Sequence, residues 1–384
     1  MSGKNDPLQP ATIAAQALGW VEEESRAISP NLQTSSTYLR DADNQYRSGR
    51  IYARADNPAF DQPEALLAAL ENGADAMLFS SGMAAATAVF LSLSPGDHVI
   101  APRVMYWSLR NWLLGFAQNW GLEVEIVDMT DPAALKRAVR PGKTKIVWVE
   151  TPANPLWDIT DLAAAAEIAH AAGARLAVDS TAATPVLSRP IDFGADIVMH
   201  SATKYLNGHS DLMAGALVTR SDDEYWAKMA AVRAQIGGVL GSFEAWLLLR
   251  GMRTLFPRVR TAVANAQKLA EHLAANPNIA QVLYPGLPDF PGHAIAARQM
   301  PGGFGAMLSI RVKGGEQAAV KTAANVHVWK RATSLGGTES LVEHRASVEG
   351  AGSPVPTDLL RLSAGIEDIA DLIADLDQAL LAAM

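Results

Sequence analysis

Short apolar runs alternate with amphipathic stretches through the first two-thirds of the chain. The amphipathic stretches, such as 62–71 and 162–172, place their apolar side chains at helical spacing and predict helices. Between such stretches lie short runs rich in Val, Ile and Leu, at 76–79, 98–101, 124–127, 146–149, 176–178, 197–199 and 215–218. This alternation is typical of a mainly parallel sheet with helices on both faces, so the pattern predicts an α/β fold.

The two ends of the chain depart from this rhythm. Residues 1–60 are polar, contain several prolines and have few apolar faces, which predicts an irregular arm. Near 250 the pattern changes to a long helix over 247–273 interrupted at Pro257, a strand at 307–310 and a closing amphipathic helix over 371–382. We therefore expect three parts: the arm 1–60, a large domain 61–248 and a smaller α/β domain 249–384.

Composition and charge narrow the class of protein. With 384 residues, 49% of them hydrophobic and 19% charged, the chain has the composition of a soluble globular enzyme. The net charge of −8, without a run of like charges, gives nucleic-acid binding little electrostatic support. The absence of cysteine excludes disulfides, thiolate metal sites and a cysteine nucleophile, and the histidines show no metal-binding motif.

The sequence carries no membrane or export signal. No apolar segment is as long as a membrane span, and the polar start from Met1 to Pro7 lacks an apolar signal core. We therefore expect a cytoplasmic protein without a membrane partner.

Lys204 is the most informative residue of the chain because it follows a buried apolar run. The run 197–199 predicts a strand, and Ser201, Thr203 and Lys204 come directly after it. A lysine at the end of a buried strand is costly unless its charge is neutralised or used, and one use is a Schiff base with an aldehyde cofactor. The two hydroxyls are suitable donors to a phosphate. The ordinary alternative is a solvated lysine at a strand end. Groups at the other strand ends are therefore needed to distinguish a cofactor lysine from a solvated one.

Three further strand ends carry suitable groups. Ser80–Met83 lies between a predicted strand and a helix, where free backbone N–H groups can hold a phosphate, although many such turns bind nothing. Asp179 follows the run 176–178 and would either cap a helix or keep a pyridine nitrogen protonated. Tyr106 would either pack in the core or stack on a flat cofactor. Because ligands bind beyond the carboxyl ends of the strands in open α/β sheets, the four groups together predict a pyridoxal 5′-phosphate site.

Five motifs in this order resemble the Cys/Met-metabolism family of pyridoxal-phosphate enzymes. The family includes cystathionine γ-synthase, cystathionine β- and γ-lyases and methionine γ-lyase. The motifs are Tyr52-Ala-Arg54-x-x-Asn57-Pro58, Ser80-Ser-Gly-Met83, Glu150-Thr-Pro-Ala-Asn154-Pro155, Ser201-Ala-Thr-Lys204-Tyr-Leu-Asn-Gly-His-Ser-Asp211 and Ser334-Leu-Gly-Gly-Thr-Glu-Ser340. The resemblance extends from about residue 45 to the end of the chain and implies a fold-type I pyridoxal-phosphate enzyme.

The resemblance implies a role for each matching residue. Lys204 would form the Schiff base with the cofactor and move the Cα proton, while Tyr106 would stack on the ring and assist proton transfer. Asp179 would pair with the pyridine nitrogen. The phosphate would be held by Gly82, Met83, Ser201 and Thr203, and the substrate carboxylate by Arg361 with help from Asn154 and Ser334.

The resemblance also gives the N-terminal arm a purpose. Tyr52 and Arg54 match a Tyr-x-Arg pair that, in this family, reaches the cofactor phosphate of a neighbouring subunit. The match implies at least a catalytic dimer and, by the habit of the family, a homotetramer built as a dimer of dimers.

Three positions depart from the family pattern in the pocket for the substrate side chain. Thr333 stands where γ-synthases and cystathionine γ-lyases have a glutamate, and Ile51 stands where an acid is frequent. Trp107 replaces a small residue and would reshape the pocket. We therefore expect a lyase that eliminates a γ-substituent from a small L-amino acid and gives a 2-oxo acid and ammonia. The alternatives are β-elimination from cystathionine, γ-replacement on an activated homoserine, and a scaffold without catalysis.

Overall fold

A seven-stranded sheet forms the centre of the larger part of the molecule. The computed structural model describes residues 8–350 and 352–383. The start from Met1 to Pro7, on which the predicted lack of an export signal depends, lies outside these residues. In spatial order the strands are β1 (Asp75–Phe79), β7 (Gly215–Thr219), β6 (Ile197–His200), β5 (Arg175–Asp179), β4 (Thr144–Glu150), β2 (His98–Pro102) and β3 (Glu123–Val127).

The sheet is mainly parallel, as predicted. Only β7 runs against its two neighbours, β1 and β6, whereas the other pairs are parallel. Parallel neighbours need a long crossover, usually a helix. The connection from β6 to β7 contains no helix, so the chain turns back and β7 pairs antiparallel.

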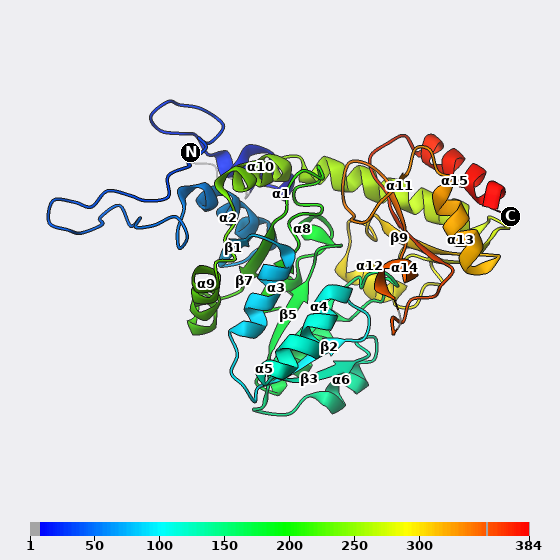
Figure 1. Cartoon of the computed structure of the whole chain (residues 1–384), viewed down its shortest axis with the longest axis horizontal. Helices are drawn as coiled ribbons and strands as arrows, with labels where there is room; N and C mark the ends of the chain where they lie inside the picture. The colour runs from blue at the N-terminus through cyan, green and yellow to red at the C-terminus, as the bar shows by residue number, and fades with distance from the viewer. Residues whose placement is uncertain (1–7, 351, 384) are drawn as a thin grey trace, which may run out of the picture.

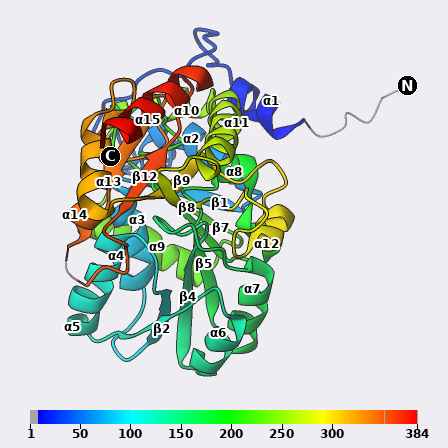
Figure 2. The ribbon, with the colours of Figure 1, turned by 90° about the vertical axis from the view of Figure 1, so that its right-hand side faces the viewer.

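Helices cover both faces of this sheet (Figure 2). One face packs against α3 (Gly82–Leu91), α4 (Trp107–Trp112) and α9 (Glu224–Ile236). The opposite face packs against α2 (Pro58–Glu71) and α10 (Ser242–Met252) at one end, and against α6 (Pro132–Ala138) and α7 (Leu162–Ala171) at the other. Alternate side chains of the central strands point to opposite faces of the sheet. Because helices cover both faces, these strands are apolar at almost every position.

A second, smaller sheet follows in the C-terminal third of the chain, drawn from yellow to red in Figure 1. Its order is β10 (Lys330–Arg331), β11 (Leu341–His344), β12 (Leu359–Ser363), β9 (Met307–Val312) and β8 (Ile279–Leu283). Helices α11 (Leu255–Ala274), α13 (Gly315–Ala324) and α15 (Ile369–Ala383) pack on it or on each other. The predicted fold, a mainly parallel α/β sheet with a smaller α/β part, is confirmed. The domain ranges 61–248 and 249–384 stay a prediction. All strands of the larger sheet lie in the first range, and all strands of the smaller sheet lie in the second.

The predicted long helix over 247–273 is two helices, α10 and α11. The break lies at Arg253 and Thr254, before Pro257 rather than at it. Pro257 lies in the first turn of α11, where a backbone N–H has no helical partner, so the missing donor costs nothing. The predicted interruption was therefore right, but its position was wrong by a few residues.

The N-terminal arm is more ordered than predicted at its start. Helix α1 (Pro10–Gln16) and a short 3-10 turn (Ala17–Gly19) bury Ala14 and Ala17 in the core cluster that contains α2. From residue 20 to Asn57 the described chain has no helix, and it extends away from the body as the long blue loop in Figure 1. A single antiparallel bridge joins Thr37 to Tyr52 within this loop.

Short helices complete the described chain. They are the π-helical turn Leu113–Ala117, α5 (Gln118–Trp120), α8 (Thr184–Leu187), the 3-10 turn Pro190–Phe193, α12 (His293–Gln299) and α14 (Ala346–Glu349). None of the helices in the described part of the chain is both long and apolar enough to cross a membrane.

Candidate active site

The loops that follow the parallel strands surround a cavity of about 360 Å³ between the two sheets. Most of the predicted site residues line this cavity, although they come from motifs far apart in the sequence. Those that line it are Gly82, Met83, Tyr106, Asn154, Asp179, Ser201, Thr203, Lys204, Thr333, Ser334 and Arg361. A cavity of this volume and concave shape suits a bound cofactor with a small substrate.

The predicted phosphate turn lies at the N-terminus of helix α3. The Ser81 hydroxyl caps the helix by accepting a hydrogen bond from the Ala84 N–H at 3.0 Å. A Cβ on residue 82 would lie 2.8 Å from the Ser201 Oγ, so only glycine lets the two loops approach this closely. The first N–H groups of a helix lack helical partners and favour anions, so this turn can hold a phosphate beside the Ser201 hydroxyl.

Thr203 has a second task that the sequence did not reveal. Its hydroxyl donates to the Ala214 carbonyl at 3.1 Å and accepts from the Ala214 N–H at 2.9 Å. These two bonds close the loop between β6 and β7 and thereby fix the position of Lys204.

Lys204 lies in a desolvated position at the centre of the cavity wall. Its Nζ donates a hydrogen bond to the Ser334 Oγ at 2.7 Å, across 130 residues of sequence. Burial, together with the positive charge of Arg361, lowers the pKa of Lys204 from 10.5 to about 8. A lysine with a lowered pKa is readily deprotonated and can then attack an aldehyde.

Asp179 ends strand β5 and is held in one orientation. Its Oδ1 accepts hydrogen bonds from the N–H and the hydroxyl of Thr181, at 3.0 and 2.6 Å. The other oxygen has no hydrogen bond to any described residue and is available to a ligand. Burial raises the pKa of Asp179 in the free protein, so a positively charged partner in the cavity would stabilise the carboxylate.

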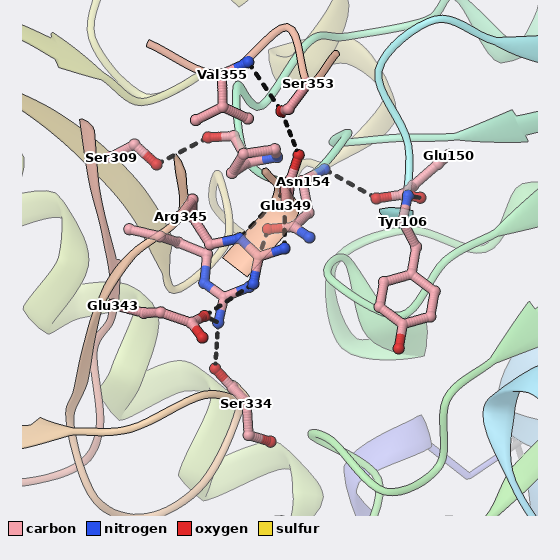
Figure 3. A network of polar contacts seen from close by, with 12 residues as sticks. Tyr106, Glu150, Asn154, Ser309, Ser334, Glu343, Arg345, Glu349, Ser353 and Val355 are labelled. Carbon is pink, nitrogen blue, oxygen red and sulfur yellow. Dashed lines mark hydrogen bonds and ion pairs between the residues drawn. The ribbon is translucent and has the colours of Figure 1, made fainter. Parts of the chain in front are cut away.

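Glu150 connects the predicted cofactor and substrate sides of the cavity (Figure 3). Its Oε2 accepts from the Tyr106 N–H at 2.7 Å, and its Oε1 accepts from the Asn154 N–H at 2.8 Å. Burial and the neighbouring charge of Asp179 raise the pKa of Glu150 to about 8. One carboxyl group therefore fixes the backbone of both Tyr106 and Asn154.

Arg361 lies on β12 and reaches the cavity from the second sheet. Its Nη1 donates to the Asn154 Oδ1 at 3.2 Å, and its Nη2 donates to the Ser334 carbonyl at 2.8 Å and to Glu343 Oε2 at 2.5 Å. The strand register explains this arrangement, since Glu343, Arg361 and Ser309 lie opposite one another on β11, β12 and β9. Burial, together with the nearby charge of Arg345, lowers the pKa of Arg361 to about 10. It remains a cation at neutral pH and can bind a carboxylate.

Four predicted site residues do not line the cavity within this chain. Ile51 and Tyr52 are 56% and 48% exposed on the arm, and the Arg54 Nη1 donates to the Ala234 carbonyl at 2.8 Å. The ring of Trp107 lies 5.2 Å beneath the Arg110 guanidinium instead of at the cavity wall.

The arrangement fits pyridoxal phosphate. The cavity offers a desolvated lysine for the aldehyde, a carboxylate oxygen without a partner for the ring nitrogen, and a glycine turn at a helix N-terminus for the phosphate. These features define the site of a pyridoxal-phosphate enzyme. The family model described as Cys/Met metabolism PLP-dependent enzyme matches residues 11–381, and the chain belongs to this family.

Known relatives cover nearly the whole chain. It is 45% identical over 377 residues to the cystathionine gamma-synthase of Mycobacterium bovis, a match that covers 97% of this chain and 96% of that protein. It is 39% identical over 398 residues to the L-methionine gamma-lyase of Porphyromonas gingivalis, with 98% and 99% covered. A solved cystathionine gamma synthase from Xanthomonas oryzae pv. oryzae, in complex with cystathionine, is 38% identical with a TM-score of 0.93, covering 98% of this chain and 99% of that one.

These findings confirm the predicted family, fold and cofactor. The chain is a pyridoxal-phosphate-dependent enzyme of the transsulfuration family. Because the relatives include both a synthase and a lyase, membership of the family does not determine whether the substrate's leaving group is eliminated or replaced.

Sequence reasoning missed several polar residues of the site: Glu150, Thr181, Glu343, Arg345 and Glu349. Glu150 had the same signal as Asp179, since each carboxylate directly follows a buried apolar run. Glu343 and Arg345 stand two residues apart on a strand pattern, and Glu349 follows Arg345 at helical spacing. Their partners could not be deduced, because these contacts depend on how the second sheet faces the first.

Proposed function

We propose that this enzyme eliminates a sulfur or oxygen substituent from Cγ of a small L-amino acid, releasing it as a thiol or related leaving group, and that hydrolysis by water then gives a 2-oxo acid and ammonia. The observation that carries the proposal is the uncharged part of the cavity wall. The charged lining residues are Glu150, Asp179, Lys204, Arg345 and Arg361, and all lie on the proposed cofactor or carboxylate side. What remains for the substrate side chain includes Met213, Thr333 and Leu335, which suit an uncharged group.

The residues divide the work as follows. The cofactor, when bound, supplies an electron sink for charge that develops at Cα. Arg361 binds the substrate carboxylate with a planar fork, and the Asn154 side chain braces that fork. The Lys204 amine takes the Cα proton, and Lys204 and Tyr106 carry the protons at Cβ and at the leaving group. Asp179 would keep a proton on the ring nitrogen, and the Gly82 turn with the Ser201 and Thr203 loop would hold the phosphate.

A second function has support from the relatives. The cystathionine gamma-synthase at 45% identity favours γ-replacement, in which a thiol takes the place of the leaving group. The two functions share the steps up to the departure of the γ-group. They differ in whether the pocket accommodates a second amino acid, and Thr333 supplies no charge for its distal amino group.

Product analysis separates these functions. The holoenzyme is incubated with cystathionine, methionine, homocysteine, canavanine, and O-acetylhomoserine with and without cysteine. We expect 2-oxobutyrate from substrates whose γ-group leaves. Pyruvate from cystathionine would show β-elimination, and a new thioether with little 2-oxo acid would refute the proposed lyase. Thr333→Glu should shift the products toward the thioether, while Lys204→Ala is the inactive control.

We also propose that the arm completes the site of a neighbouring copy in a homo-oligomer, a dimer of dimers. A second cavity, of about 790 Å³, adjoins the first through Thr203, Met213, Thr333 and Ser334. Its wall contains Asp211, Glu244 and Glu339, so it suits a cationic segment. The exposed Tyr52 and Arg54 provide an aromatic ring and a cation.

Mixed oligomers test this proposal. A chain with Arg54→Ala supplies an intact Lys204, and a chain with Lys204→Ala supplies an intact arm. Mixing the two should restore part of the activity, because some sites then receive both groups. Subunit exchange is followed by the mass of the mixed oligomers. If subunits exchange and no activity returns, the arm does not cross between subunits. The cytoplasmic location stays a prediction.

A further inference from the structure

Four charged side chains are buried together behind the proposed carboxylate site. They are Glu343 on β11, Arg361 on β12, Arg345 just after β11, and Glu349 on α14. The side chains of the two arginines are 5% exposed, and those of Glu343 and Glu349 are 9% and 3% exposed. Two positive and two negative charges balance, and Arg345 also lines the cavity.

The contacts form a chain that ends at Arg361. Figure 3 labels its other members, Glu343, Arg345 and Glu349. Glu343 Oε2 accepts from Arg361 Nη2 at 2.5 Å and from Arg345 Nη1 at 2.9 Å. Glu349 Oε1 accepts from the other edge of Arg345, from Nη2 at 2.7 Å and Nε at 3.2 Å. The second Glu349 oxygen accepts from the Ser353 hydroxyl at 2.6 Å.

Stability alone is a poor explanation for this cluster. Burying ions costs desolvation energy that their attraction repays only with good geometry, and well-packed apolar residues of similar volume are often at least as stable. A pair consisting of Glu343 and Arg361 would already be neutral. The additional pair, Arg345 and Glu349, needs another reason.

That reason is competition between two carboxylates for one guanidinium. If Glu343 had Arg361 as its only cation, an incoming substrate carboxylate would have to share that cation with it. Arg345 donates to the same Glu343 oxygen, so Glu343 keeps a cation when Arg361 turns to the substrate. Glu349 occupies the remaining edge of Arg345, which would otherwise be a second binding place for the substrate carboxylate.

We propose that Arg345 and Glu349 are positioning residues for substrate binding: Arg345 supports Glu343 so that Arg361 is available to the substrate carboxylate, and Glu349 prevents Arg345 from binding that carboxylate itself. This inference rests on the proposed function in one respect, the role of Arg361 as the carboxylate receptor.

The test compares two ligands that differ only in the carboxylate. Norleucine has no leaving group at Cγ, and pentylamine is norleucine without its carboxylate. Dissociation constants are measured on the holoenzyme from the change in the cofactor absorption spectrum. Arg345→Met should weaken norleucine binding by about 30-fold or more, because it removes one partner of a buried charged hydrogen bond. Pentylamine binding should stay within about twofold, because the amine does not use this cluster.

Glu349→Gln should act in the opposite direction. It removes the negative charge that holds one edge of Arg345 and so weakens that contact, and norleucine should bind as tightly as before or more tightly. The kcat for substrate should fall, because some carboxylate is held by the wrong arginine. A purely structural role would not separate KM from kcat in this way. Arg311→Met is the matched control, since its ion pair with Asp358 lies on the same sheet away from the cavity, and neither ligand should respond to it.

Three results would overturn the proposal. One is an equal loss of norleucine and pentylamine binding in Arg345→Met, and another is unchanged norleucine binding. The third is a Glu349→Gln enzyme that loses norleucine affinity as strongly as Arg345→Met does. If Arg345→Met does not fold, Arg345→Met with Glu349→Met carries the test, since no carboxylate of that pair is left without a partner.

Failure of the proposed function is distinguishable. If Arg361 is not the receptor, Arg361→Met leaves norleucine binding unchanged. If the enzyme breaks another bond, the products change but the norleucine measurement stays valid.

Discussion

The lowered pKa of Lys204 predicts how fast the cofactor-free protein captures pyridoxal phosphate at each pH. Only the uncharged amine attacks an aldehyde. Lowering the pKa from 10.5 to about 8 raises the uncharged fraction at pH 7 by about 300-fold. The rate of capture should rise tenfold per pH unit below 8 and become constant above it, because Lys204 is then neutral.

Replacement of Arg361 tests the cause of this shift. Burial is the largest cause, and the positive charge of Arg361 is the next. In Arg361→Met, Glu343 keeps Arg345 as a partner, while Lys204 loses a nearby repelling charge. The pH at which the rate becomes constant should therefore move upward, and capture at pH 7 should be slower than in the parent protein.

Rapid mixing of cofactor-free protein with pyridoxal phosphate, followed by absorbance, measures these rates. A free lysine side-chain analogue in the same buffers corrects for titration of the cofactor itself. Borohydride reduction followed by peptide mass analysis locates the residue that carries the cofactor. The Lys204→Ala protein should carry no reduced cofactor at position 204. A capture rate that rises in parallel with the free amine beyond pH 9 would refute the reasoning.

Three other changes test separate parts of the site and core. Glu150→Gln replaces one of the two acceptor oxygens by an N–H donor, which then faces a backbone N–H. The change should weaken cofactor or substrate binding by about 1–3 kcal/mol, measured by equilibrium dialysis for the cofactor and by KM for the substrate. Gly82→Ala should weaken phosphate binding by a similar amount, because its Cβ meets the Ser201 loop, and unchanged cofactor affinity would contradict the proposed turn. Trp148→Ala should lower the free energy of unfolding in urea by about 3–5 kcal/mol. Trp148→Phe should cost less than half as much, since the indole Nε1 has no partner within the described chain.

Local patterns were sufficient to predict the mainly parallel sheet and the cofactor. The strand containing Asp179 is apolar over 176–178 and the strand before Lys204 over 197–199, and an α/β sheet aligns the carboxyl ends of such strands at one edge. The same rule, applied to the strand 144–150, would have found Glu150. Errors arose where a tertiary contact outweighed the local pattern. Helix α1 forms from a proline-containing segment because Ala14 and Ala17 are buried against the core.

The sequence by itself determined the family and the cofactor, because Lys204, Asp179 and the Gly82 turn each follow a buried strand and match the motifs of that family. The tertiary structure decided which distant residues meet at the predicted carboxylate site. Arg361 meets Asn154 across 207 residues, and Lys204 meets Ser334 across 130, only because the second sheet packs over the edge of the first. The paired charges around Glu343 depend on strand register and on burial between these sheets. Neither these long-range contacts nor the paired charges are encoded in any short segment, since both result from packing distant elements against one another.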